Sequence, residues 1–296
     1  MSGARDRDLI FTANDQEKNK IEPGVLYLVA TPIGNLADLS ERAVKVLANV
    51  DFIAAEDTRN TAKLLSYLNI SKPMVSYYQH NRTERGEVIC KRLSEGESCA
   101  LVTDAGTPAI SDPGEDLVRL CAEKNIKVTF VPGACAAIAA LALSGLFTGR
   151  FAFEGFVSGA KGERRKRLDE LKNDDRTLIF YEAPHHLLNT LKDFYTVFGD
   201  RKISLCRELT KLNEEIIRTT LSAAVEYYTQ NSPRGEYVLV IEGGEKKKDD
   251  FWVSLTPIEH VDFYINQGMD KNSAIKAAAS DRSVQKNEIY KEYLKK

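Results

Sequence analysis

Four loops that contain glycine, proline or closely spaced charges each follow an apolar stretch of the sequence. They span residues 31–35 (TPIGN), 56–59 (EDTR), 104–114 (DAGTPAISDPG) and 132–136 (PGACA). Glycine lets a backbone approach a ligand closely, and proline holds a loop in a fixed shape. One such loop is ordinarily a tight turn, but four of them at predicted strand ends favour a ligand-binding site.

The second loop, EDTR, is dense in charge. A carboxylate of Glu56 or Asp57 beside the guanidinium of Arg59 could orient a substrate hydroxyl or phosphate. The alternative is a helix start, because Asp57 or Thr58 can cap a helix and acidic residues favour its N-terminus. The residue types alone leave both interpretations open.

Lys161–Arg167 is the one concentrated basic stretch, with sequence KGERRKR. It follows a predicted strand and a glycine-containing loop, so it is expected near the same site. Its positive side chains Lys161, Arg164, Arg165 and Arg167 could pair with RNA phosphates. A solvated helix face is an equally good interpretation.

Composition excludes several classes of protein. The 296 residues carry 41 Lys and Arg against 43 Asp and Glu, a formal net charge of -2. A polycation that coats nucleic acid is therefore excluded, and any contact with RNA or DNA must come from a local patch. No apolar run approaches the ~20 residues that span a bilayer, so no membrane partner is expected. A DNA partner is not expected either. The five cysteines form no CxxC pair, which favours reduced thiols in the cytoplasm.

Two common kinds of nucleotide or metal site are also missing from the sequence. No two glycines are separated by a single residue, so the G-x-G-x-x-G loop of dinucleotide-binding proteins is absent. The four histidines show no metal-ligand spacing, and no metal is predicted. We expect His185, His186 and His260 to have structural or surface roles.

Apolar runs alternate with amphipathic stretches from residue 25 onward. The alternation predicts an α/β domain over residues 24–148 with a mostly parallel sheet. Its first helix is expected to begin at the N-cap Ser40. A second α/β domain is predicted over residues 149–245, where the last strands lie close together in sequence and favour a mixed sheet.

Three further segments flank these domains. Residues 1–23 are predicted to form a flexible leader, and 243–250 a charged linker. Residues 251–296 are predicted to form a small helical module. Its first helix opens with a capping box from Thr256 to Glu259 and has proline at the first helical position.

Eight stretches, taken together and in order, identify a resemblance. They are LYLVATPIGNLADLSERAVKVL, AAEDTRNTAKLL, LVTDAGTPAISDPG, VPGACAAIAALALSG, FEGF, FYEAPHHLL, RELTKLNEE and RGEYVLVIEG. The set resembles the tetrapyrrole methylase superfamily, and within it the enzymes that methylate a ribose 2'-hydroxyl of ribosomal RNA. The resemblance covers about residues 24–245, and the tail is similar to the family's C-terminal helical module. It implies two αβα domains with a cofactor cleft between them, S-adenosylmethionine as cofactor, and a homodimer.

The resemblance also implies roles for individual residues. The EDTR stretch would face the acceptor, with Glu56 or Asp57 taking or orienting its proton and Arg59 or Lys211 positioning a phosphate. The cofactor would contact Pro32, Asp104, Ala105, Gly106, Thr107, Ile110, Gly133, Ala134, Cys135, Tyr181, Glu182, Ala183, Arg234 and Gly235.

The expected reaction is methyl transfer to the ribose of cytidine 1402 in the 16S rRNA of the small ribosomal subunit, in its decoding centre. A C-methyltransferase of a tetrapyrrole or corrinoid precursor would share the fold and the cofactor, but it would need neither the basic stretch nor the helical tail. A non-catalytic RNA-binding factor would not need the four loops.

Overall fold

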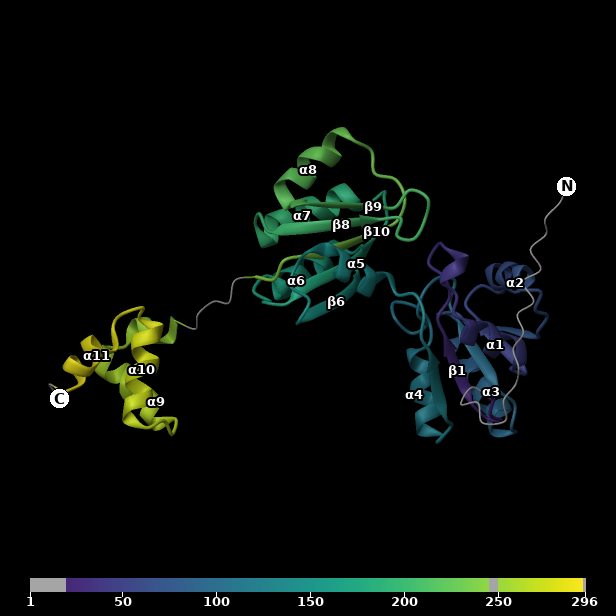
Figure 1. Cartoon of the computed structure of the whole chain (residues 1–296), viewed down its shortest axis with the longest axis horizontal. Helices are drawn as coiled ribbons and strands as arrows, with labels where there is room; N and C mark the ends of the chain where they lie inside the picture. The colour runs from purple at the N-terminus through teal and green to yellow at the C-terminus, as the bar shows by residue number, and fades with distance from the viewer. Residues whose placement is uncertain (1–19, 245–249, 295–296) are drawn as a thin grey trace. The chain divides into compact units, whose positions relative to one another are not determined.

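The computed structural model describes residues 20–244 and 250–294. Figure 1 shows the described helices and strands and labels many of them. The predicted leader lies outside the described residues except for 20–23, and the predicted linker lies outside them at 245–249. The described chain forms two compact units. The first contains both β-sheets, and the second contains Arg165–Arg176 and the chain from Gly243 onward.

The first sheet is parallel throughout, with strand order β3-β2-β4-β1-β5. Every residue of β2 and β4 is buried, as is typical of a parallel sheet covered on both faces. The prediction of a mostly parallel first sheet is confirmed. Its strands are β1 (Leu26–Val29), β2 (Phe52–Ala55), β3 (Met74–Ser76), β4 (Cys99–Val102) and β5 (Val128–Val131).

Helices cover both faces of this sheet. Buried residues of α1 and α2 join one core cluster, and those of α3 and α4 join a cluster on the opposite face. The predicted N-cap is confirmed, because Ser40 Oγ accepts a hydrogen bond from Ala43 N at 3.1 Å. The helices are η1 (Leu36–Asp38), α1 (Glu41–Asn49), α2 (Thr58–Tyr67), α3 (Arg82–Ser94) and α4 (Glu115–Glu123).

The second sheet is mixed, as predicted. Its order is β6-β7-β10-β8-β9; β6 and β7 are parallel, and the other neighbours are antiparallel. The elements from β6 onward are β6 (Phe151–Phe156), α6 (Lys161–Leu171), β7 (Thr177–Glu182), α7 (Leu187–Phe198), β8 (Lys202–Arg207), β9 (Glu215–Thr220), α8 (Leu221–Gln230) and β10 (Tyr237–Ile241).

Helix α5 (Ala136–Ser144) follows the last strand of the first sheet but packs on the second. Its Ala140 and Leu141 share a core cluster with Ile179 and Val240. The opposite face of the second sheet carries α7, where the rings of Phe180 and Phe194 lie 4.7 Å apart. Helix α5 therefore ties the end of the first sheet to the core of the second.

In its described part, the chain from residue 250 onward contains the 3-10 helix η2 (Asp250–Ser254) and three α-helices, α9 (Pro257–Asn266), α10 (Lys271–Asp281) and α11 (Lys286–Tyr293). The predicted capping box is confirmed, since Thr256 and Glu259 each satisfy the other's backbone N–H. His260 is fully buried, in agreement with its expected structural role. None of the helices that the structure describes combines the length and apolar character needed to cross a membrane.

Candidate functional site

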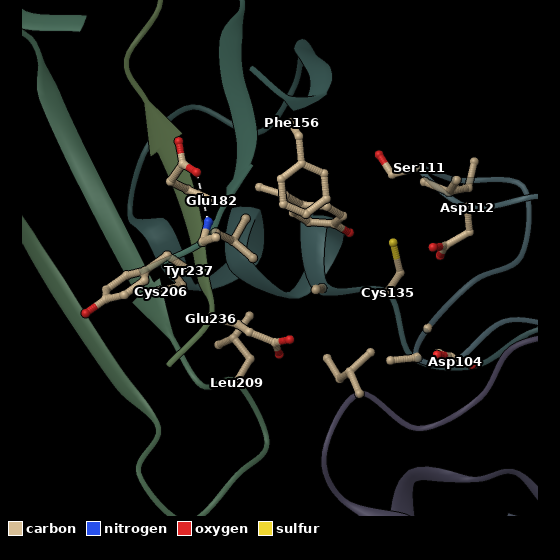
Figure 2. A pocket seen from close by; sticks show the side chains of 18 of the residues that line it. Asp104, Ser111, Asp112, Cys135, Phe156, Glu182, Cys206, Leu209, Glu236 and Tyr237 are labelled. Atoms are coloured by element: carbon tan, nitrogen blue, oxygen red, sulfur yellow. Dashed lines mark hydrogen bonds between the residues drawn. The ribbon is translucent and has the colours of Figure 1, made fainter. Parts of the chain in front are cut away.

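A pocket of about 430 Å³ lies where loops and strand ends of both sheets meet. This volume is within the usual range of small-molecule sites. Figure 2 shows Asp104, Ser111, Asp112 and Cys135 on one side of this space, and Glu182, Cys206, Leu209 and Tyr237 on the other. The first sheet contributes the loops after β1, β2, β4 and β5, and the second contributes the ends of β6, β7 and β8 and the start of β10.

Hydrogen bonds join three of the loops predicted from the sequence. Thr31 and Gly106 exchange both backbone hydrogen bonds, at 2.8 and 3.1 Å. Thr107 Oγ1 donates to the carbonyl oxygen of Ala134 at 3.0 Å. Gly106 has φ +89°, a conformation that side chains rarely adopt. The loops after β1, β4 and β5 therefore form one connected wall.

The pocket lining is acidic. Its acids are held by different partners: Thr103 Oγ1 donates to Glu56 at 2.6 Å, and Asn60 Nδ2 donates to Asp104 at 2.9 Å. Lys211 Nζ donates at 2.8 and 2.7 Å to two further carboxylates of the lining. The described residues that line the pocket include six with carboxyl groups and one with an ammonium group, Lys211. The six are Glu56, Asp104, Asp112, Glu182, Glu208 and Glu236.

Asp112 differs from the other acids because its pKa is strongly raised. Burial, and next the negative charge of Glu56, raise the pKa of the Asp112 carboxyl to about 6, against a hydrogen bond with Thr103 that lowers it. Tyr181 stays a neutral phenol, since burial raises its pKa to about 12. Asp112 therefore gains and loses a proton close to neutral pH.

Glu182 is held at the pocket wall by a chain of hydrogen bonds. Its carboxylate is buried and accepts from Ala183 N at 2.8 Å and from the Thr190 hydroxyl. Thr190 Oγ1 accepts in turn from Arg164 Nη2 at 2.9 Å, and Arg164 Nε pairs with Asp193 at 2.6 Å. Arg164, one of the predicted RNA-binding residues, is thus only 14% exposed and turned toward the protein.

The other three predicted RNA-binding residues are exposed on α6. Arg165 pairs with Asp169 and Arg167 with Glu170, both at 3.0 Å along the helix. Lys161 begins the helix. The basic stretch therefore contains one arginine that points inward and a group of exposed cations. The exposed cations fit the interpretation as a solvated helix face. Their contact with RNA stays a prediction.

The structure brings eleven of the predicted catalytic and cofactor residues to the pocket lining. Pro32, Gly133, Ala134, Arg234 and Gly235 are outside it. Gly235, at φ +77°, supports the lining instead, because an added Cβ would lie 2.5 Å from Glu208 Cγ. The residues at the pocket are Glu56, Asp104, Ala105, Gly106, Thr107, Ile110, Cys135, Tyr181, Glu182, Ala183 and Lys211.

Asp57 and Arg59 are also outside the pocket lining. Asp57 is the N-cap of α2: it accepts from Arg59 N at 2.8 Å and from the Arg59 guanidinium at 2.7 Å. This hydrogen bonding to Arg59 lowers the pKa of Asp57 to about 2. The helix-start interpretation accounts for both residues, and their catalytic role stays a prediction.

Sequence reasoning missed several lining residues. Ser111 and Asp112 lie in the loop 104–114, which was predicted to bind a ligand. The loop was therefore identified, but these two residues were not predicted to be part of the site. Phe156, Cys206 and Val238 lie within strands. In the sequence, an apolar strand residue that lines a pocket cannot be distinguished from one that packs in the core. The other lining residues that were not predicted are Ile33, Ala136, Pro184, Glu208, Leu209, Glu236 and Tyr237.

Residues 25–225 match the family model of the tetrapyrrole (corrin/porphyrin) methylases. A ribosomal RNA small subunit methyltransferase I from Halalkalibacterium halodurans is 48% identical over 275 residues, which cover 92% of this chain and 95% of that protein. The enzyme of that name from Synechocystis is 46% identical over 268 residues, with 90% and 96% covered.

Solved structures of low sequence identity share the fold. A cobalt precorrin-4 methyltransferase superposes with a TM-score of 0.55 at 17% identity and covers 74% of this chain and 95% of its own. A uroporphyrin-III C-methyltransferase from Thermus thermophilus, complexed with S-adenosylhomocysteine, superposes with a TM-score of 0.54 at 18% identity, with 75% and 97% covered. The predicted fold class, two α/β sheets of tetrapyrrole methylase type, is confirmed.

Proposed function

Because the chain belongs to the tetrapyrrole methylase family, and within it to the ribosomal RNA small subunit methyltransferases I, we propose that it methylates small-subunit rRNA. The methyl donor is S-adenosylmethionine. The acceptor is the ribose 2'-hydroxyl of cytidine 1402 in 16S rRNA, either free or in the small ribosomal subunit, and the reaction takes place in the cytoplasm.

The acidic pocket is the observation that carries this proposal. S-adenosylmethionine has a positive sulfonium and a positive amino group, and the lining sets six carboxyl groups against Lys211. Because Lys211 is itself paired with Glu208 and Glu236, the lining presents a net negative charge to a cationic ligand. The same charge disfavours an RNA phosphate inside the pocket, so only the acceptor ribose is expected to reach it.

The small residues of the wall suit a flat ligand. Ala105, Gly106 and Cys135 leave room for a nucleoside, and the hydrogen bonds between their loops fix the shape of the wall. We propose that these residues, with Asp104, Thr107, Ile110 and the segment 181–183, hold the donor. When bound, S-adenosylmethionine supplies a methyl group whose carbon–sulfur bond breaks with its electron pair passing to sulfur. The protein mainly aligns donor and acceptor.

We assign two further roles to residues of the pocket. Glu56, fixed by Thr103, orients the acceptor ribose, and Lys211 supports the loop after β8 through its pairs with Glu208 and Glu236. Outside the pocket, the exposed cations of α6 contact RNA phosphates. These roles follow from position and charge.

A homodimer is the proposed assembly. Large apolar side chains stay exposed from α5 to β6, and apolar surface of this kind is typical of protein interfaces. They include Ile138, Leu143, Phe147, Phe151 and Phe156, which are 38–67% exposed. Light scattering of the purified chain measures the mass directly; a value near the 33.1 kDa of one chain contradicts the dimer.

The proposed function is tested by transfer of a tritiated methyl group from S-adenosylmethionine to small ribosomal subunits that lack this modification. Digestion and separation of the nucleosides identify the labelled product. Label in a 2'-O-methylated cytidine supports the proposal. Label only in a tetrapyrrole precursor offered in parallel would instead favour a macrocycle C-methyltransferase.

A further inference from the structure

A ribose 2'-hydroxyl has to lose its proton as its oxygen forms a bond to the methyl carbon. We propose that a carboxylate oxygen of Asp112 accepts this proton, a role that rests on the proposed function. The pocket places this side chain in the lining, on the same side as Asp104 and Cys135 (Figure 2). Each of the other carboxylates of the pocket accepts a hydrogen bond from a neighbouring side chain.

Cations or backbone donors hold the acids contributed by the second sheet. Glu208 and Glu236 share the ammonium of Lys211, which lowers the pKa of Glu208. Glu182 accepts from Ala183 N and from Thr190. A cation beside a carboxylate favours its charged form, so Glu208 is a poor proton acceptor.

The acids contributed by the first sheet are partnered as well. Glu56 accepts from the Thr103 hydroxyl at 2.6 Å and from Asp104 N at 3.4 Å. Asp104 accepts from Asn60. Asp57, with both oxygens on Arg59, is outside the lining altogether.

For Asp112, burial outweighs the hydrogen bond with Thr103. Burial comes first among the causes that raise its pKa to about 6, followed by the charge of Glu56, while Thr103 lowers it and Asp104 adds to the rise. Tyr181 lines the same pocket as a neutral phenol, because burial raises its pKa to about 12. A general base works best when its pKa lies near the working pH, because it is then ionised and still basic.

The loop that carries Asp112 is held in a strained shape. Ala109 and Ser111 have φ of +67° and +61°, which is unusual for residues with a side chain. Gly114 packs so tightly that an added Cβ would lie 3.0 Å from Ala109 Cβ. Gly155 in β6 faces Ser111 Oγ, which an added Cβ would meet at 2.8 Å. Strain of this kind persists where the surroundings fix it, and it is concentrated at functional sites.

The proton follows a short route in the proposed step. As the 2'-oxygen bonds to the methyl carbon and the carbon–sulfur electron pair passes to sulfur, the hydroxyl proton moves to Asp112 Oδ. The carboxylic acid then releases it to water. No oxidant, reductant or metal is needed for this balance.

The test compares the full-length wild type with D112N and D112E, and with D38N as a control at an exposed aspartate. The single-turnover rate of methyl transfer by the wild type is measured between pH 5 and 8. It should rise about tenfold per pH unit below pH 6 and be constant above it. D112N should lower the plateau by about 10²- to 10⁴-fold and abolish the rise. D112E should keep the rise, and the affinity of D112N for S-adenosylmethionine should stay within about threefold.

A second readout needs neither cofactor nor RNA. The pKa of Asp112 is higher in the folded state (about 6) than in the unfolded chain (about 3.9), so its ionised form is disfavoured by folding. The urea concentration at the midpoint of unfolding should therefore fall for the wild type, relative to D112N, as the pH rises from 4 through 6. D112N should be the more stable protein at pH 7.5, and D38N should follow the wild type.

Two results would overturn the assignment while the wild type still labels RNA. One is a D112N variant with the rate and pH profile of the wild type, and the other is an identical pH dependence of the two urea midpoints. A wild type that binds S-adenosylmethionine but labels no RNA overturns the proposed function, and the role of Asp112 falls with it. The two failures are thus distinguishable.

Discussion

At the scale of single residues, Glu182 shows how a buried carboxylate is kept at a pocket wall. Its charge is balanced through Thr190 by Arg164, a residue of α6 that lies outside the lining. Removing one partner of a buried network leaves the others unsatisfied, which costs more than the interaction itself contributed. Arg164 is therefore expected to matter for the cofactor although it does not touch the pocket.

We predict that Arg164→Ala lowers the free energy of unfolding by about 1–3 kcal/mol and weakens binding of S-adenosylmethionine roughly fivefold, because Glu182 loses its fixed position. Arg165→Ala is the matched control, since Arg165 is 60% exposed and pairs with Asp169 along the helix surface. It should cost about 0.5 kcal/mol or less. Urea unfolding and calorimetric titration measure both quantities. An Arg164→Ala variant that loses only RNA affinity would contradict this role.

The sequence was sufficient to identify the loops that form the pocket, but not the chemical role of each residue in them. Glycine and proline marked the loop 104–114, the family resemblance implied that Asp104, Gly106 and Thr107 contact the cofactor, and all three line the pocket. The role of Asp57 stayed open between cap and catalyst, since a cap and a base use the same residue type. The basicity of Asp112 could not be predicted, because it arises from burial and from Glu56, more than fifty residues away.

At the scale of elements, Gly155 joins β6 to the pocket loop. It has φ +63° at an irregularity of the β6–β7 pairing, and Ser111 Oγ occupies the space of a Cβ. We predict that Gly155→Ala destabilises the protein by about 1–3 kcal/mol, from backbone strain and from contact with Ser111. Urea unfolding measures the change.

Gly159→Ala is the control, since nothing lies within 4 Å of its added Cβ. The double variant Gly155→Ala/Ser111→Ala should regain only the part of the stability that was lost through contact with Ser111. The part lost through the positive φ of residue 155 should remain. Equal stability of Gly155→Ala and the wild type would show that the turn at β6 is not constrained by the loop.

Helix α5 shows where prediction from periodicity stops. The alternation of strands and helices, and the start of helix α1, were predicted because apolar runs alternate with amphipathic stretches. Residues 136–144 are small and apolar on all sides (AAIAALALS), so the sequence gives no preferred face. That this helix packs on the second sheet follows only from the three-dimensional arrangement.

At the scale of the whole molecule, a net charge of -2 limits how RNA can be bound. Binding through the exposed cations of α6 should involve about three phosphates, so log Kd should rise with log salt with a slope of roughly 2–3. Replacing Lys161, Arg165 and Arg167 by alanine should weaken RNA binding and bring the slope toward zero, while cofactor affinity stays unchanged. Arg119→Ala on α4 is the control, because Arg119 has the same kind of surface pair, with Asp116. An unchanged slope in the triple variant, measured by fluorescence anisotropy, would place the RNA contact on another surface of the molecule.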